Sequence, residues 1–214
     1  MEHFVCATCG VQFAASDEPP AECPVCEDAR QWVPEDGQRW TTMDDLASEH
    51  RNELRDDEGL TGIGTDPHFA IGQRALIVPS AIGNVLWECV TLLDDAIELW
   101  NGETRDVGGL TLLRLGGHFR GGTVLHRPEG SGTLLSGDIV QVIPDRRWVS
   151  FMYSYPNLIP LPAETVLRMA DLLKPYAFET MQGAWWGTTV RGDAKAIVQR
   201  SAERYARALA GDLF

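Results

Sequence analysis

The sequence has no apolar run long enough to span a membrane and is short of basic residues. Its apolar stretches fall well below the roughly 18 residues that a spanning helix needs. The first residues, MEHFVCATCG, lack the basic-then-apolar build of a signal peptide, so we expect a cytoplasmic protein. The 18 basic residues face 31 acidic ones, a net charge of -13. This charge repels phosphate backbones and anionic lipid, which argues against nucleic acid and membrane as partners.

Histidines and nucleotide-binding loops are also scarce. The chain has five histidines, and none follows His126. GLTGIGTDPHF at 59–69 has neither the Lys-Ser/Thr ending of a P-loop nor the pattern G-x-G-x-x-G. We therefore predict turns there, with His68 in a surface loop. What the chain does have is 44% hydrophobic residues in a length of 214, enough for one good core and a small satellite domain.

Four of the five cysteines form two C-x-x-C pairs near the N-terminus. The pairs are Cys6 with Cys9 and Cys23 with Cys26. Each C-x-x-C turn aims two sulfurs at one point, so two pairs suit a tetrahedral metal site, with zinc ahead of iron. Disulfides are the weaker interpretation where no export signal is present. With Gly10 and Pro24, the pairs resemble the knuckles of zinc ribbons and rubredoxins, which implies a structural zinc knuckle over residues 1–34.

The charge around these cysteines indicates whether such a knuckle binds nucleic acid or has a structural or protein-docking role. Residues 1–30 hold six acidic side chains and one basic one, Arg30. This composition favours a structural or protein-docking role over nucleic-acid binding. Metal binding would supply the folding free energy of a segment too small for its own core.

The middle of the chain is predicted to pass from a helix into strands. TTMDDLASEHRNELRDD at 41–57 has helical spacing, a capping pair at Thr42 and Asp45, and His50 on the packed face. From residue 75 onward, short apolar runs between glycine and proline turns predict a sheet. These runs are ALIV, NVLWECVTLL, LTLLRL, TVLH, TLLS and IVQVI. Alternation within the second run makes Cys89 a core thiol.

Two amphipathic helices are predicted near the C-terminus, PAETVLRMADLLKPY at 162–176 and DAKAIVQRSAERYARALAG at 193–211. Apolar residues recur on one stripe of each, so both should pack on the sheet. Gly211 has the position of a C-terminal cap.

A family resemblance lies in the second half of the chain. GGHFRGGTVLH followed by TLLSGDIVQVIPD resembles the metallo-β-lactamase-fold hydrolases, and ALIV with NVLWECVTLLDD is similar to that fold's early strands. The likeness runs from about residue 70 to the end. It implies an α/β fold, an αββα sandwich over residues 35–214. It also implies that His118 is a metal ligand and that Asp138 is a catalytic carboxylate that holds one divalent metal or bridges two. The family activity is hydrolysis of an ester, amide or thioester by metal-activated water.

The chain departs from this family pattern in two places. The family's principal motif, His-x-His-x-Asp-His, is absent, because VTLLDD leads through AIELWNGETRDVGG directly into LTLLRLGGH. A strand-helix unit of at least about 30 residues is thus missing from the expected sandwich. Trp185 and Trp186 stand where relatives supply a last histidine, and tryptophan does not bind zinc.

Two interpretations of His118 and Asp138 therefore stay open. They hold a second metal with helpers such as Asp94, Asp95, His126 or a second chain, or they are remnants that only hydrogen-bond in a loop. The incomplete ligand set predicts weak or absent hydrolysis. The alternative is a non-catalytic zinc-binding interaction or regulatory protein.

The sequence also leads us to expect a substrate pocket and a protein partner. Arg146 and Trp148, together with Trp185 and Trp186, are candidates to line a pocket for a small anionic or apolar substrate. The alternative is a buried aromatic strand beside surface arginines. A sheet opened by the missing unit would expose an edge, which predicts a homodimer or another protein as a cover.

Overall fold

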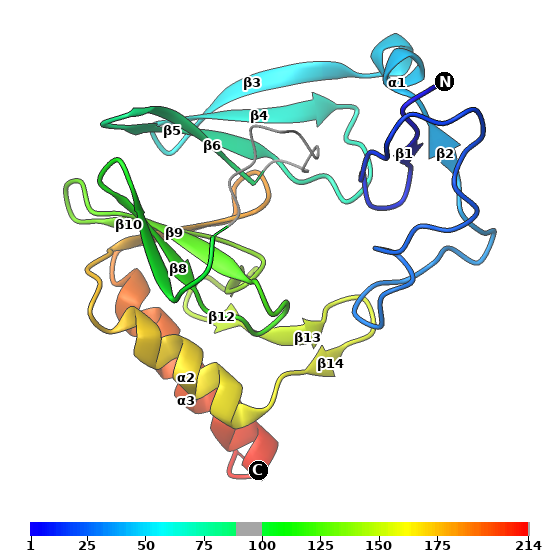
Figure 1. The fold of residues 1–214 in the computed structure, drawn as a ribbon. Helices are drawn as coiled ribbons and strands as arrows, with labels where there is room; N and C mark the ends of the chain where they lie inside the picture. Colours follow the sequence, from blue (N-terminus) through cyan, green and yellow to red (C-terminus); the bar gives the residue numbers. More distant parts are fainter. Residues whose placement is uncertain (89–99, 214) are drawn as a thin grey trace. The chain divides into compact units, whose positions relative to one another are not determined.

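The computed structural model describes residues 1–88 and 100–213 and divides into two units. Unit 1 comprises Met1–Pro79 with Asn84–Trp100, and unit 2 comprises Ser80–Gly83 with Asn101–Phe214. Strands dominate both units, and the helices are few (Figure 1). The expected α/β class is confirmed, whereas the αββα sandwich stays a prediction. None of the helices described is both long and apolar enough to cross a membrane.

Unit 1 begins with the cysteine-rich segment. Its strand β1 (Val5–Cys6) pairs antiparallel with β2 (Trp40–Thr41). Trp40 packs edge-on against Phe13, with ring centroids 5.3 Å apart, and both rings contact the cysteine cluster. The predicted boundary at residue 34 stays a prediction, but this pairing ties the segment at 40–41 to the cysteines.

Helix α1 (Met43–Glu49) is shorter than the sequence predicts. The capping pair is confirmed, because Thr42 Oγ1 accepts a hydrogen bond from the Asp45 amide at 3.2 Å. The helix ends at Glu49, however, with His50 as its C-cap, and none of its residues is buried. The predicted continuation to residue 57 is wrong, since Arg51–Asp57 forms strand β3. Pairing along the full length of β3 overrides the weak helical preference of this segment.

The sheet of unit 1 has the strand order β3-β4-β5-β6. Its other strands are β4 (Leu60–Asp66), β5 (Ala75–Ser80) and β6 (Gly83–Trp87). The prediction of turns at 59–69 is wrong for the part that forms β4. The turn is confined to Glu58 and Gly59, both at positive φ (58° and 80°), which is the geometry of a two-residue hairpin. His68 is exposed in a loop, as expected, and Cys89 lies outside the described residues.

Unit 2 contains a six-stranded sheet in the order β16-β15-β10-β9-β8-β7. Its strands are β7 (Thr104–Val107), β8 (Leu110–Arg114), β9 (Thr123–Arg127), β10 (Thr133–Gly137), β15 (Thr180–Gly183) and β16 (Thr189–Arg191). Two short ladders pair β11 (Gln141–Val142) with β12 (Val149–Ser150) and β13 (Met152–Ser154) with β14 (Ile159–Pro160). The pair β10 and β15 is parallel, and the chain between these strands includes the first helix of this unit.

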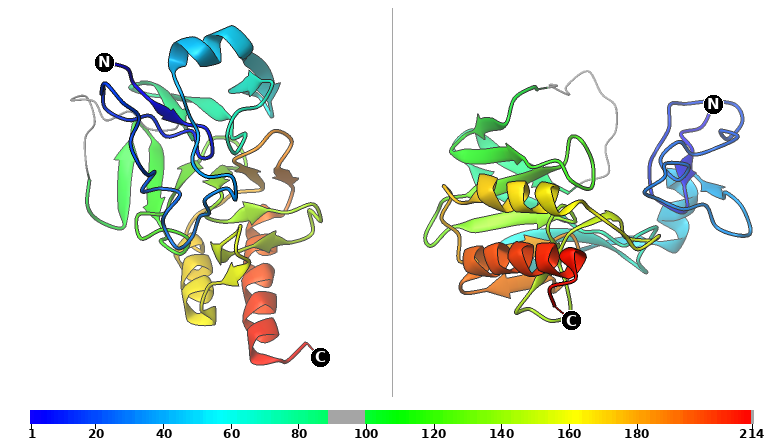
Figure 2. Two further views of the ribbon diagram at one scale, coloured as in Figure 1. Left: turned by 90° about the vertical axis from the view of Figure 1, so that its right-hand side faces the viewer. Right: turned by 90° about the horizontal axis from the view of Figure 1, so that it is seen from below.

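Helices α2 (Ala163–Leu173) and α3 (Ala194–Ala210) lie side by side and cover the sheet of unit 2 (Figure 2). The predicted apolar stripe of α2 is confirmed, because its four members are buried. They are Val166, Met169, Ala170 and Leu173. On α3, Ile197, Val198 and Ser201 are buried as expected, whereas Leu209 is 47% exposed. Gly211 caps α3 at a φ of 81°, also as predicted.

A buried and a partly exposed leucine of α2 allow the predicted orientation of this helix to be tested. Leu173 is fully buried and Leu167 is 38% exposed. We expect Leu173→Ala to lower the free energy of unfolding by about 2–5 kcal/mol, because it removes buried methyl groups and leaves a cavity. Leu167→Ala should change it by less than about 0.5 kcal/mol. Chemical denaturation measures both, and equal losses would contradict this orientation of the helix.

Candidate metal centres

The four cysteines of the N-terminal segment meet at one point. Their sulfur atoms all lie within 4.8 Å of one another, with Cys6 and Cys26 3.7 Å apart and Cys9 and Cys23 3.6 Å apart. A disulfide would need about 2.05 Å, so these thiols are free. Tetrahedral zinc with bonds of about 2.3 Å places its sulfurs roughly 3.8 Å apart. The cluster can therefore hold a metal ion such as zinc.

The backbone of the first knuckle already favours a thiolate. Gly10, at a φ of 80°, turns the chain so that its amide donates to the Cys6 carbonyl at 2.8 Å. Burial opposes ionisation of Cys6, but the amides of Cys9 and Thr8 donate to its sulfur and lower the pKa of this thiol. The second knuckle repeats the turn, with the Glu27 amide donating to the Cys23 carbonyl at 3.0 Å.

The thiols of Cys9 and Cys26 need a nearby cation to ionise, because their pKa values are raised. Burial raises the pKa of Cys26 to about 12 and raises the pKa of Cys9 further, and the neighbouring Cys6 sulfur adds repulsion to both. Four thiolates cannot coexist this closely without a positive ion between them. Cys6, Cys23 and Cys26 are at most 2% exposed, so water cannot take over that role.

In unit 2, His118 lies in a tight loop between β8 and β9. Gly116 and Gly117 have positive φ values (69° and 82°), and the amides of Leu115 and Gly116 both donate to the Gly122 carbonyl at 2.9 Å. A Cβ at Gly117 would approach the Met169 sulfur to 2.6 Å, so a side chain there would collide with α2. The glycines thus let this loop lie against the helix.

Asp138 follows β10 and faces His118. The Nε2 atom of His118 is 3.7 Å from Oδ2 of Asp138, while Nδ1 of the same ring bonds the Tyr153 carbonyl at 2.7 Å. A carbonyl partner at Nδ1 favours the tautomer with the proton on Nδ1 and the lone pair on Nε2, the form in which imidazole binds a metal. Burial raises the pKa of the Asp138 carboxyl, and the charge of His118 works against this rise. His118 is 1% exposed.

The predicted helpers of this pair are not beside it in the part of the chain that the structure describes. Only the cysteine cluster groups three or more metal-binding side chains among these residues. His126 is buried on β9, where its Nε2 bonds the Ala177 carbonyl at 2.8 Å. Asp94 and Asp95 lie outside the described residues. Among the described residues His118 and Asp138 therefore stand as a pair without a third candidate ligand, and that they bind a metal stays a prediction.

The four predicted pocket residues occupy two places in unit 2. Arg146 donates to the Gly187 carbonyl at 2.8 Å, so it is tied to the loop that carries Trp185 and Trp186, both half-buried. Trp148 lies under the guanidinium of Arg204, 4.3 Å from the ring centroid to Cζ, and lines a pocket of about 250 Å³ with it. That these residues bind a substrate stays a prediction.

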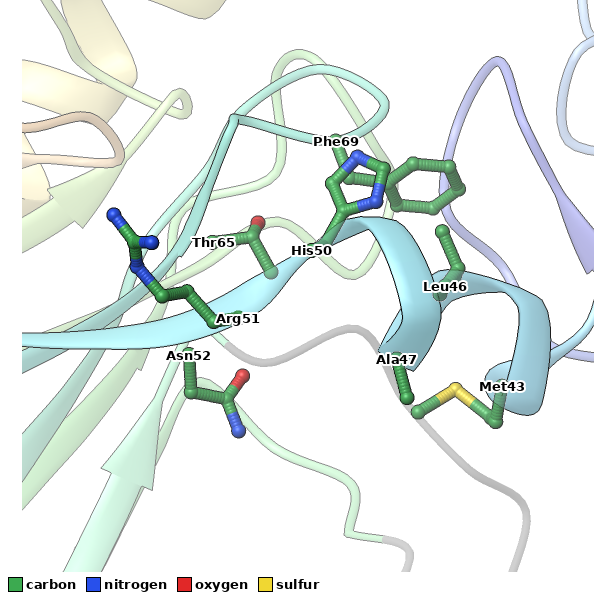
Figure 3. Close-up of a pocket in the computed structure, with 8 residues that line it drawn as sticks. All are labelled: Met43, Leu46, Ala47, His50, Arg51, Asn52, Thr65 and Phe69. Carbon is green, nitrogen blue, oxygen red and sulfur yellow. The ribbon is translucent and has the colours of Figure 1, made fainter.

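A second hollow was not expected from the sequence. A pocket of about 170 Å³ lies where α1 meets β3. Figure 3 shows the apolar and polar side chains that line it. Leu46 and Phe69 form part of its wall, and the His50 ring packs edge-on against Phe69 at 5.7 Å. Sequence reasoning missed this pocket because it predicted a helix at residues 51 and 52, which instead belong to strand β3 and line the pocket.

One curated protein is similar to the chain over its whole length. The chain is 40% identical to the uncharacterized protein YmaE of Bacillus subtilis (strain 168), over an alignment of 273 residues that covers 100% of this chain and 99% of YmaE. The chain belongs to the YmaE family. No family model matches it, and no solved structure does. Since this chain has 214 residues, at least 59 residues of YmaE have no counterpart in it.

The raised thiol pKa values predict how metal binding depends on pH. Metal-free Cys9 and Cys26 are protonated at neutral pH, so binding must release at least their two protons. The apparent zinc affinity should therefore fall at least about a hundredfold per pH unit as the pH is lowered from about 8 to about 6. Competition with a chromogenic chelator measures this slope. The His118→Ala variant should have the same slope, and an affinity independent of pH would contradict the buried thiol cluster.

Proposed function

We propose that this protein binds zinc through its four N-terminal cysteines and carries a metallo-β-lactamase-like domain with an incomplete catalytic metal site. Hydrolysis of an ester, amide or thioester is then weak or absent. The Gly-His loop, the Gly-Asp strand end and the parallel β10 and β15 joined through α2 support the domain assignment. The distances between the four cysteine sulfurs support zinc as the first metal.

One observation carries the second part of this proposal. The Nε2 atom of His118 and the carboxylate of Asp138 are 3.7 Å apart, too far for a hydrogen bond but suited to two ligands on either side of one ion. Bonds of about 2.1 Å to each would fit an ion between them. A bound divalent ion would supply Lewis acidity and an activated water. The Tyr153 carbonyl would orient His118, and the Tyr155 hydroxyl, which donates to the Asp138 carbonyl at 2.8 Å, would hold the carboxylate's backbone.

Two protein ligands fall below the three that ordinary catalytic zinc sites have. The pair should therefore exchange its ion readily, and metal lost on dialysis leaves no activated water. On this reasoning the domain keeps the fold of a hydrolase and little of its chemistry.

Metal counting tests both parts of the proposal. After dialysis we expect about one zinc per chain by mass spectrometry of the elements. The Cys6→Ser variant should lose this zinc, whereas His118→Ala should retain it. Hydrolysis of a chromogenic ester or thioester should be the same for the unaltered protein and for Asp138→Asn.

Other outcomes would overturn specific parts. Two or more metals per chain that fall on His118→Ala, with hydrolysis lost in Asp138→Asn, would show a competent hydrolase. Absence of metal from freshly purified, reduced protein would overturn the zinc assignment.

A non-catalytic interaction protein is the second candidate. The six acidic side chains and single arginine of residues 1–30 belong to the same segment as the cysteine cluster, which suits a folded module that docks a basic protein surface. A zinc-loaded protein without hydrolysis, which still binds a basic partner peptide in a salt-dependent way, would favour this candidate.

A further inference from the structure

Strand β12 and the C-terminal half of helix α3 lie side by side in unit 2 (Figure 1). A pocket of about 250 Å³ lies between them. Its walls are mostly apolar, with Trp148 and Val149 on the strand side and Tyr205 and Ala208 on the helix side. Pockets for drug-sized ligands hold roughly 300–1,000 Å³, so this one suits a single ring or a short acyl chain.

Two hydrogen bonds join the walls of this pocket. The Val149 amide donates to Oγ of Ser201 at 3.0 Å, which ties β12 to α3. The Arg200 guanidinium donates to the Arg147 carbonyl, also at 3.0 Å. A ligand therefore enters a pocket whose walls are already fixed, and its binding has to order few further side chains.

Arg204 supplies a positive charge at the edge of the pocket. Its side chain is exposed, and its Cζ lies 4.3 Å from the centroid of the Trp148 ring. The N–H groups of a guanidinium lie in its plane, so stacking on a ring leaves them available to an anion. The Trp148 ring thus orients Arg204 without occupying its hydrogen-bond donors.

The neighbouring arginines have acidic partners. Arg147 donates to both carboxylate oxygens of Asp145, at 2.9 and 2.8 Å, and Arg200 lies 3.5 Å from the carboxylate of Asp193. Arg147 is also the main cause that lowers the pKa of Asp145 to about 2, whereas Arg204 is the weakest. In the part of the chain that the structure describes, Arg204 has no ion pair or hydrogen bond of its own, and its direct contact is the tryptophan ring.

Helix α3 is basic in a chain that is acidic overall. Residues 194–210 hold four basic side chains and one acidic one, whereas the whole chain has a net charge of -13. Arg200 and Arg204 lie four positions apart, so their like charges face each other on the helix and repel. A bound anion would relieve this repulsion, and arginine recognises a carboxylate through two parallel hydrogen bonds.

We infer that this pocket binds a small carboxylic acid with an apolar body, such as an aryl or short acyl acid. Arg204 holds the carboxylate, and the body packs on Trp148 between the apolar walls. The apolar walls disfavour a bare inorganic anion, and the guanidinium favours an acid over a neutral molecule. One guanidinium balances the single charge of a carboxylate, whereas a phosphate monoester carries nearly two charges.

This inference corrects the role expected of Arg146 and rests on neither metal site. The Arg146 guanidinium donates to the Gly187 carbonyl and does not line this pocket, so Arg204 takes the role of the anion-binding arginine. The described lining of the pocket contains none of the four N-terminal cysteines, nor His118 or Asp138. Loss of either metal would therefore leave the pocket in place.

Titration of the full chain with 3-phenylpropionate tests the inference. The indole N–H resonance of Trp148, one of seven tryptophans, is assigned by its loss in Trp148→Phe and followed by NMR. We expect this resonance to shift with a Kd of about 1 mM or tighter. The neutral 3-phenylpropanol should bind at least about tenfold more weakly, and acetate, which has no apolar body, more weakly still.

Three variants separate the charge from the cavity. Arg204→Gln should weaken 3-phenylpropionate at least about tenfold and change 3-phenylpropanol less than about twofold. Arg207→Gln removes the same charge one turn further along α3, outside the pocket lining, and should change the affinity for the acid less than about twofold. Ala208→Phe fills the cavity from an exposed position of the helix and should abolish binding of both molecules. The melting temperature of each variant should stay within about 2 °C of the unaltered protein.

A peptide that ends in phenylalanine presents the same chemistry as the free acid. Gly-Gly-Phe and its C-terminal amide distinguish the two sources. Tighter binding of Gly-Gly-Phe than of 3-phenylpropionate, lost in the amide, would assign the carboxylate to a peptide C-terminus. Tighter binding of 3-phenylpropionate would assign it to a free acid, and either result supports the site.

Other outcomes would overturn the inference. Equal affinities for 3-phenylpropionate and 3-phenylpropanol would show an apolar pocket without anion recognition. Equal weakening by Arg204→Gln and Arg207→Gln would show a general effect of charge. Binding that survives Ala208→Phe, or that leaves the Trp148 resonance unmoved, would place the ligand elsewhere.

Discussion

Burial of α2 and α3 against the six-stranded sheet is the interaction on which unit 2 depends. It fills the core, and it also positions the candidate site, because α2 contacts the loop that carries His118. Arg168 of α2 donates to the Leu115 carbonyl at 2.7 Å, and Gly117 leaves room for Met169. The apolar packing that stabilises this unit therefore also positions the loop that carries His118, while the Tyr153 carbonyl holds the ring itself.

The two candidate metal centres differ in how far apart in sequence their ligands lie. Each C-x-x-C pair is a local turn, so only one approach between two short segments is needed to assemble Cys6, Cys9, Cys23 and Cys26. His118 and Asp138 depend on the ends of two strands and on tertiary packing. The second centre therefore depends on the packing of unit 2, whereas the cysteine cluster depends only on the approach of two short segments within residues 6–26.

Sequence reasoning performed best where one local pattern decides the outcome. The cysteine spacing predicted the cluster, and the apolar stripe of α2 predicted its buried face. It failed at 51–57 and 60–66, because an antiparallel pairing of two strands decides their conformation and neither strand has a strong local signal. Gly62 and Gly64 indicate a loop when read alone, but both are buried within β4. The carbonyl of Tyr153 behind His118 could not be predicted either, since backbone partners leave no trace in residue type.

On the function proposed above, zinc binding and hydrolysis do not depend on the same parts of the chain. The cysteine cluster takes its four ligands from residues 6–26. A catalytic site at His118 and Asp138 would need further ligands, and the described residues do not place a third one beside this pair. Because the two sets of residues are separate, a metal in the cysteine cluster can be retained where the proposed catalytic metal is held weakly.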